Sequence, residues 1–197
     1  MKESKRSAQI ERETKETKIK LSLYTDAEIP GLYGSSGIGF FDHMLNTFAV
    51  HGGFEIALEM SGDLDVDCHH SVEDTGIVLG RAFGDIISQN KNITRFAHEY
   101  VPMDESLAMC SADLGGRAYL VFNAEFGFGS IGGYDAQMTK EFFRAMAHNM
   151  SATIHINLLY GENDHHKTEA IFKAAAKAVK KALTPAGGYI ISAKGVI

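Results

Sequence analysis

The sequence predicts an α+β fold with an internal duplication, in which two similar halves each contain strands, a helix, a strand and a helix, with sheets packed on helices. The motif His-His-x-x-Glu occurs at residues 69–73 and again at 165–169, which is 96 positions later (165 − 69) in a chain of 197 residues. A run of small and apolar residues with helical spacing follows each copy. Strand-like segments and a second helix-like segment precede both copies in the same order. A separation close to half the chain indicates two repeats.

The first half begins with strand-like and turn-like segments. Residues 19–24 alternate polar and apolar side chains as a half-buried strand does, and residues 31–39 are predicted to be a glycine-rich turn region. Residues 40–49 have the apolar spacing of a helix and lead into a pair of glycines. Residues 54–60 alternate again and predict a strand. The first motif then opens a helix that we expect to end near Gln89.

The second half repeats this order. Residues 107–113 and 117–126 predict a hairpin around a pair of glycines, residues 138–150 a helix and residues 153–159 a strand, after which the second motif opens the last helix. We therefore expect a first half over 1–92, a second half over 93–186 and a C-terminal tail over 187–197.

Residues 127–132 match the dinucleotide-binding pattern GxGxxG. Such a site needs a βαβ unit with an acidic residue about 20 positions further on. The rest of the chain instead carries the second His motif. We therefore expect a mobile loop at this position.

Composition excludes several classes of partner. The formal net charge is −6, which argues against nucleic acid as the main ligand. No run of apolar residues is long enough for a membrane helix, and no signal-peptide stretch is present at the start. Two cysteines do not form a disulfide framework, so we expect a cytoplasmic protein.

Each motif has the residue types and the spacing of a metal site. Residues four apart on a helix lie about 40° apart around its axis, so His69 and Glu73 face together, as do His165 and Glu169. Imidazole and carboxylate are good ligands for divalent transition metals. A single copy is equally typical of a solvated helix start with a favourable acid. Two copies in equivalent places favour a metal.

The second imidazole of each pair needs a different partner, because adjacent residues on a helix diverge by about 100°. If the two repeats are related by a pseudo-twofold axis, the second imidazole of each motif can join the ligands of the other motif, within a chain or between neighbouring chains. In that hypothesis one ion takes His69, Glu73 and His166, and the other takes His165, Glu169 and His70.

Two further residues are candidate ligands because of their place in the repeat. His43 begins the first-half helix, and Glu141 begins its counterpart in the second half. Each would complete one site, giving the roughly octahedral nitrogen and oxygen coordination that Mn²⁺, Fe²⁺ or Zn²⁺ accepts.

Several segments in order along the chain resemble one enzyme family, imidazoleglycerol-phosphate dehydratase of histidine biosynthesis, in its monofunctional form. The resemblance covers essentially the whole chain. The segments that carry it are 14–17, 39–45, 67–74, 92–96, 163–173 and 192–196.

This resemblance implies a hydro-lyase that converts D-erythro-imidazoleglycerol phosphate into imidazole-acetol phosphate. It also implies two Mn²⁺ ions per active site and a homo-oligomer of twenty-four subunits with active sites between subunits. The implied metal ligands are His43, His69, His70, Glu73, Glu141, His165, His166 and Glu169. The family often has His where this chain has Glu141.

The resemblance also implies a set of substrate-binding residues, with Glu16 as the group that moves the proton. Arginine and lysine suit a phosphate dianion. The implied substrate contacts are Glu16, His51, Arg95, Arg117, Lys173, Ser192 and Lys194. Family members commonly have Ser at the position of Ala193.

Two other classes use similar ligands. A metal-storage protein would place its ligands on four long helices, whereas strands are interleaved throughout this sequence. A dinuclear metal phosphohydrolase is the enzymatic alternative, because two-metal sites also cleave phosphate esters.

Overall fold

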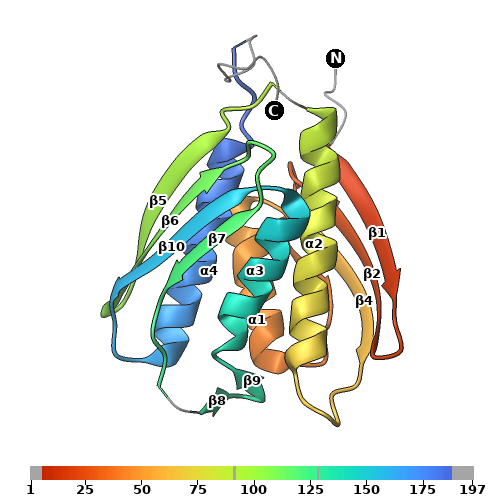
Figure 1. Ribbon diagram of the computed structural model, residues 1–197, viewed down its shortest axis with the longest axis vertical. Helices are drawn as coiled ribbons and strands as arrows, with labels where there is room; N and C mark the ends of the chain where they lie inside the picture. Colours follow the sequence, from red (N-terminus) through yellow and green to blue (C-terminus); the bar gives the residue numbers. More distant parts are fainter. Residues whose placement is uncertain (1–5, 91, 128, 188–197) are drawn as a thin grey trace.

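The computed structural model describes residues 6–90, 92–127 and 129–187, and Figure 1 shows two sheets on the outside with four helices between them. The first sheet has the order β1-β2-β4-β3 and the second has the order β5-β6-β10-β7. The first half comprises β1 (Ser7–Glu13), β2 (Thr17–Tyr24), β3 (Gly31–Gly34), α1 (Gly39–Gly52), β4 (Glu55–Gly62) and α2 (His69–Gln89). The second half comprises β5 (Phe96–Met103), β6 (Ser106–Asp113), β7 (Tyr119–Asn123), β8 (Ser130–Ile131), β9 (Tyr134–Asp135), α3 (Met138–Met150), β10 (Thr153–Tyr160) and α4 (Asp164–Ala182).

The two halves have the same topology. In each sheet the first three strands in the sheet order pair antiparallel, and the fourth strand runs parallel to its neighbour, as β3 does to β4 and β7 to β10. The predicted α+β class with two similar halves is confirmed. The last element of the first half, α2, ends before residue 92, and the first element of the second half, β5, begins after residue 93. The exact boundaries of the halves and of the tail stay predictions.

The sheets pack on the helices because their strands alternate as a one-sided strand must. In β2, Ile19, Leu21 and Leu23 are buried against the helices, whereas Lys18 and Lys20 face outward. Buried side chains of both halves join in one continuous core. Both cysteines are free and buried.

Three parts of the sequence prediction need correction. The hairpin of 107–113 with 117–126 is wrong, because β6 pairs with β5 and β10 on its two sides and β7 pairs only with β10. The region 31–39 is partly strand β3 rather than turn alone. Strands β1 and β5 were not expected; β1 carries charges along an edge of its sheet, which weakens the hydrophobic pattern of a strand.

Local boundaries otherwise agree closely with the predictions. The helix expected at 138–150 is α3, and α2 ends at Gln89. The segment 127–132 leads into the short β8–β9 hairpin ahead of α3. Among the described residues, no helix is long and apolar enough to cross a membrane.

Glycines on α2 allow α3 to lie unusually close to it. A β-carbon added at Gly76 would lie 2.6 Å from the Phe142 carbonyl oxygen, and one added at Gly80 would lie 2.5 Å from the carbonyl oxygen of Met146. Since successive glycines of α2 meet successive turns of α3, the two helices run in parallel. Both begin at the end of the molecule that carries β8 and β9, at the bottom of Figure 1.

We expect Gly80→Ala to destabilise the protein, although alanine favours helices, because its methyl group would overlap the backbone of α3. The expected cost is about 1–3 kcal/mol, the usual range for overpacking, and a fall of several degrees in thermal midpoint would reveal it. Gly39→Ala is the matched control, since nothing lies within 4 Å of a β-carbon added there. Equal midpoints for the two variants would contradict the close packing.

Candidate metal centre

Asx side chains place both His motifs at the starts of their helices. Asn163 Oδ1 accepts hydrogen bonds from the backbone N–H groups of His165 at 2.9 Å and His166 at 3.3 Å, which caps α4. Asp67 Oδ1 accepts from the N–H of His69 at 2.7 Å at the start of α2. The two motifs therefore begin their helices with equivalent local geometry.

The second motif forms a compact ligand cluster with α1, which we call the His43 cluster and which consists of His43, His165 and Glu169. Glu169 Oε2 lies 3.3 Å from His165 Nε2 and 3.6 Å from His43 Nε2. One ligand atom from each residue lies within 4.8 Å of the others. Two imidazole nitrogens and a carboxylate at this spacing fit a divalent transition metal.

The surroundings of Glu169 favour the ionised form of its carboxylate by lowering its pKa. Burial acts to raise its pKa, but the hydrogen bond and charge of Lys173, together with the charges of His43 and His165, outweigh burial, and the pKa of Glu169 lies below its usual value. Lys173 Nζ contacts Oε1 at 2.7 Å. Because Lys173 occupies Oε1, the other oxygen is left to face the imidazoles.

The first motif forms a counterpart with α3, which we call the Glu141 cluster and which consists of His69, Glu73, Glu141 and Arg144. His69 Nε2 lies 3.2 Å from Glu73 Oε2, as the helical spacing predicts. Arg144 Nη2 lies 3.3 Å from Glu73 Oε1 and 2.5 Å from Glu141 Oε2. A guanidinium thus joins the two carboxylates of this cluster.

The second imidazoles of the motifs contact other carboxylates. His70 Nδ1 lies 2.9 Å from Asp63 Oδ2, and His166 Nδ1 lies 2.6 Å from Glu105 Oε2. Among the described residues of one chain, neither imidazole joins a group of metal-ligand spacing. The hypothesis that one ion takes His69, Glu73 and His166 and the other His165, Glu169 and His70, within a chain or between neighbouring chains, stays a prediction.

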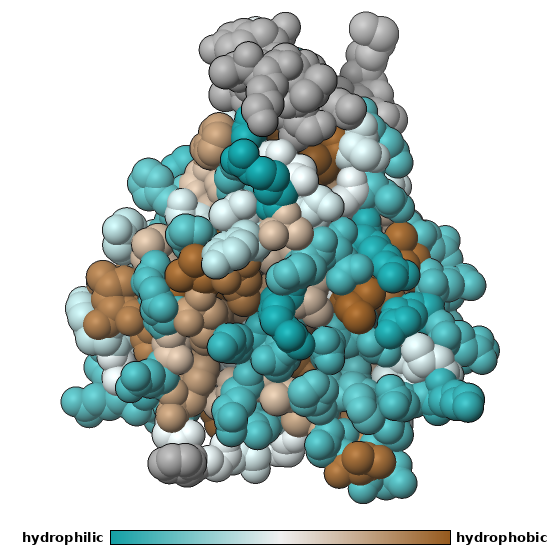
Figure 2. Space-filling view, in the orientation of Figure 1, coloured by the Kyte–Doolittle hydropathy of each residue, from teal (hydrophilic) through white to brown (hydrophobic). Residues whose placement is uncertain are grey.

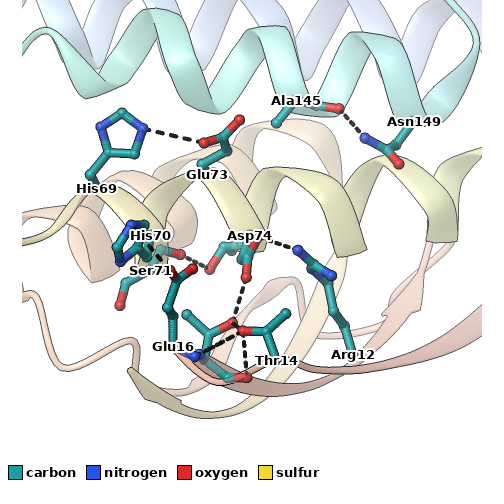
Figure 3. A network of polar contacts seen from close by, with 12 residues as sticks. Arg12, Thr14, Glu16, His69, His70, Ser71, Glu73, Asp74, Ala145 and Asn149 are labelled. Carbon is teal, nitrogen blue, oxygen red and sulfur yellow. Dashed lines mark hydrogen bonds and ion pairs between the residues drawn. The ribbon is translucent and has the colours of Figure 1, made fainter. Parts of the chain in front are cut away.

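Hydrogen bonds hold Glu16 beside His70 at the start of α2, as Figure 3 shows. Thr14 Oγ1 accepts from the N–H groups of Glu16 and Thr17 in the turn between β1 and β2. Asp74 of α2 accepts from the Thr17 hydroxyl at 2.5 Å. Glu16 itself is half-exposed, and its Oε1 lies 3.8 Å from His70 Nε2.

Arg95 and Arg117 meet at a different end of the molecule. Arg95 makes a two-pronged contact with Asp113 at 2.7 and 3.2 Å, and the exposed Arg117 lies 3.6 Å from the same carboxylate. The backbone N–H of Arg95 donates to the carbonyl of Ala182, in the last turn of α4. His165 lies 17 residues earlier (182 − 165), which is roughly 25 Å along the helix at about 1.5 Å per residue.

The remaining predicted contacts divide into two groups. Burial and the charges of Lys173 and Lys177 lower the pKa of His51, and the charge of Glu169 in the His43 cluster opposes this shift. Ser192 and Lys194 lie outside the described residues.

Three residues that contact the two His motifs were not anticipated from the sequence: Asp63, Glu105 and Arg144. Asp63 directly follows β4, and Glu105 lies in the turn between β5 and β6. Recognising residues 96–103 as a strand would have placed Glu105 in a hairpin turn. Arg144 is three residues after Glu141, a spacing that predicts an ion pair on a helix.

Comparisons with known proteins point to one family. The model of the imidazoleglycerol-phosphate dehydratase family matches residues 36–179. A protein of that name from Lacticaseibacillus casei is 49% identical over 194 residues, covering 98% of this chain and 100% of the relative. The protein of that name from Streptococcus mutans is 46% identical over 194 residues, with the same coverage of both chains.

Solved structures of the same name have the same fold. The crystal structure of the Staphylococcus aureus protein matches with a TM-score of 0.82 at 38% identity, covering 91% of this chain and 99% of that chain. The Pyrococcus furiosus structure matches with a TM-score of 0.78 at 33% identity, covering 95% and 100%.

We expect His43→Ala to weaken Mn²⁺ binding by more than about tenfold, because even residues that only support a ligand commonly change metal affinity by that factor. Elemental analysis after dialysis against a fixed Mn²⁺ concentration measures this. The control is His98→Ala, which removes an exposed imidazole on β5. Equal metal content in the two variants would remove His43 from the ligand set.

Proposed function

Since the chain belongs to the imidazoleglycerol-phosphate dehydratase family of hydro-lyases, we propose that it dehydrates D-erythro-imidazoleglycerol phosphate to imidazole-acetol phosphate in histidine biosynthesis. The reaction breaks a C–H bond and the C–O bond of the neighbouring carbon, releases water and leaves an enol that becomes the ketone. The observation that carries this proposal is the convergence of His43, His165 and Glu169 on one point.

The two clusters, together with His70 and His166, supply the residues that would hold the metals. We propose Mn²⁺ as the metal, two per active site, with ligands His43, His69, His70, Glu73, Glu141, His165, His166 and Glu169. Bound there, the ions would lower the pKa of the substrate imidazole and polarise the departing hydroxyl. In the Glu141 cluster, the single positive charge of Arg144 lies against both Glu141 and Glu73 and offsets one of their two negative charges.

Glu16 is the proposed proton carrier. Its carboxylate is half-exposed, belongs to a turn fixed by Thr14 and Asp74, and lies beside His70. A carboxylate that is positioned by its backbone but open to solvent can take a proton from a carbon and release it to water or to the leaving hydroxyl. Catalysis then depends on the turn between β1 and β2 staying in place.

The phosphate of the substrate is proposed to bind Arg95 and Arg117, with Ser192 and Lys194 of the tail. Asp113 holds Arg95 in a fixed orientation, and a fixed guanidinium loses little freedom when it binds phosphate. Lys173, which contacts Glu169, and His51, in the last turn of α1, are the proposed contacts at the other end of the substrate.

The separation of these groups supports an active site shared between chains. Arg95 and His165 belong to opposite ends of α4, roughly 25 Å apart along the helix. A substrate whose imidazole and phosphate are joined by three carbons cannot reach both. We therefore propose that the phosphate-binding arginines and the metal ligands of one site come from different subunits of a homo-oligomer, in line with twenty-four subunits for the family.

The surface provides apolar area for such an assembly. Figure 2 shows brown residues gathered on the left of the molecule, where Figure 1 places the second sheet. The exposed large hydrophobic side chains of the strands of this sheet are Phe96, Tyr100, Tyr119, Leu159 and Tyr160. Apolar area of this kind is typical of a subunit interface. The free buried cysteines suit the cytoplasm, which we propose as its location.

We expect the Mn²⁺-loaded protein to convert imidazoleglycerol phosphate into imidazole-acetol phosphate without releasing inorganic phosphate. Proton NMR of the reaction mixture detects the ketone, and a phosphate assay on the same sample detects ester cleavage. The family enzyme from a relative serves as the positive control. Stoichiometric inorganic phosphate with no ketone would make the protein a dinuclear metal phosphohydrolase instead.

A further inference from the structure

Two imidazoles in equivalent places each donate to a carboxylate that has no assigned role. His70 Nδ1 contacts Asp63 Oδ2 at 2.9 Å, and His166 Nδ1 contacts Glu105 Oε2 at 2.6 Å. An ionised carboxylate only accepts hydrogen bonds, so each Nδ1 must carry a proton. In the neutral imidazole, Nε2 is then the nitrogen with the free lone pair.

We propose that Asp63 and Glu105 are positioning residues that fix His70 and His166 in the Nδ1–H tautomer, so that Nε2 of each imidazole is available to a divalent metal. Metal-binding histidines commonly donate their other N–H to a carboxylate, which sets the tautomer and the ring orientation. This inference rests on the metal sites of the proposed function and adds two residues to them.

The two contacts come from different elements, which argues that they were not simply copied with the repeat. Asp63 follows β4, whose counterpart in the second half is β10. Glu105 instead lies between β5 and β6, at the place equivalent to the β1–β2 turn that carries Glu16. The two halves therefore form the same carboxylate–imidazole contact with carboxylates from non-equivalent segments.

Hydrogen bonds hold the carboxylate of Glu105 and the backbone of Asp63 in position. Glu105 Oε1 accepts from the backbone N–H groups of Asn163 at 2.8 Å and Glu162 at 3.1 Å, and this leaves Oε2 for His166. For Asp63 the backbone is held: its N–H donates to the carbonyl oxygen of Glu16 at 3.1 Å, while its Oδ1 is buried without a hydrogen-bond partner among the described residues. The fixed carboxylate of Glu105 therefore sets the direction of the His166 ring, and the fixed backbone of Asp63 places its carboxylate next to His70.

The other nitrogen of each ring faces a more exposed acid. His166 Nε2 lies 3.6 Å from Asp104 Oδ2, and His70 Nε2 lies 3.8 Å from Glu16 Oε1. These distances are too long for strong hydrogen bonds. In each ring Nδ1 therefore makes the short contact with a carboxylate, whereas Nε2 has only a long one. This is the arrangement expected for a ring that binds a metal through Nε2.

Glu105→Gln tests the tautomer because glutamine keeps the size of the side chain. Its amide oxygen can still accept from Asn163 and Glu162, and its NH₂ group then faces His166 Nδ1. The ring must accept at Nδ1 and carry its proton on Nε2, where it blocks the metal. We expect the affinity for Mn²⁺ to fall about 10–100-fold for the affected sites.

The measurement is a titration of the intact, metal-stripped protein with Mn²⁺ alone, followed by the EPR signal of the free ion. Asp104→Asn is the matched control, since it removes the same charge near the same ring but leaves Nδ1 untouched. An exposed charge of this kind is expected to change affinity by about fivefold at most.

A second variant covers the case in which Glu105→Gln disturbs the start of α4. Asp63→Asn changes the contact to His70 without touching α4, and we expect the same class of weakening. If neither substitution weakens Mn²⁺ binding more than Asp104→Asn does, the inference is overturned.

The Mn²⁺-binding test of this inference and the activity test of the proposed function can fail independently. A protein that binds Mn²⁺ and responds to Glu105→Gln as expected, but does not dehydrate imidazoleglycerol phosphate, would keep the inference and refute the function. A protein that dehydrates the substrate, while neither Glu105→Gln nor Asp63→Asn weakens Mn²⁺ binding more than Asp104→Asn does, would keep the function and refute the inference.

Discussion

Helices α2 and α3 approach so closely that the backbone of one lies against the glycines of the other, and the positions of the candidate ligands depend on this contact. The contact brings Glu73 of α2 within reach of Arg144 and Glu141 of α3. On the other side of the core, α1 lies against α4 and brings His43 to Glu169. Because each helix pair runs in parallel, both clusters form at the end of the molecule where the helices begin.

The carboxylates of the two motifs make the electrostatic potential at this end of the molecule favourable for cations. Helix starts carry partial positive charge, which favours acids and opposes metal ions, and the carboxylates of both motifs offset it. In each motif the Glu divides its oxygens in the same way: one contacts a cation, Lys173 or Arg144, and the other faces an imidazole. The contact with the cation fixes the orientation of the carboxylate.

Local periodicity predicted the parts of the site that depend on one helix alone. His69 with Glu73 and His165 with Glu169 are four residues apart, so their geometry follows from the helix itself. Strand pairing depends on residues far apart in the chain, which is why the order of β6, β7 and β10 was not predicted correctly. Asp63 and Glu105 reach their imidazoles only through the packing of the sheets, and no spacing in the sequence indicates that contact.

The distance between Arg95 and the His43 cluster makes sharing of the active site between chains the central claim. Co-expression of Arg95→Ala with His43→Ala tests this claim most directly, since each variant alone lacks one part of every site. If the parts come from different chains, random mixing leaves about a quarter of the sites intact, so the mixed assembly should regain about a quarter of wild-type activity. Mixed assemblies as inactive as either parent would contradict a shared site.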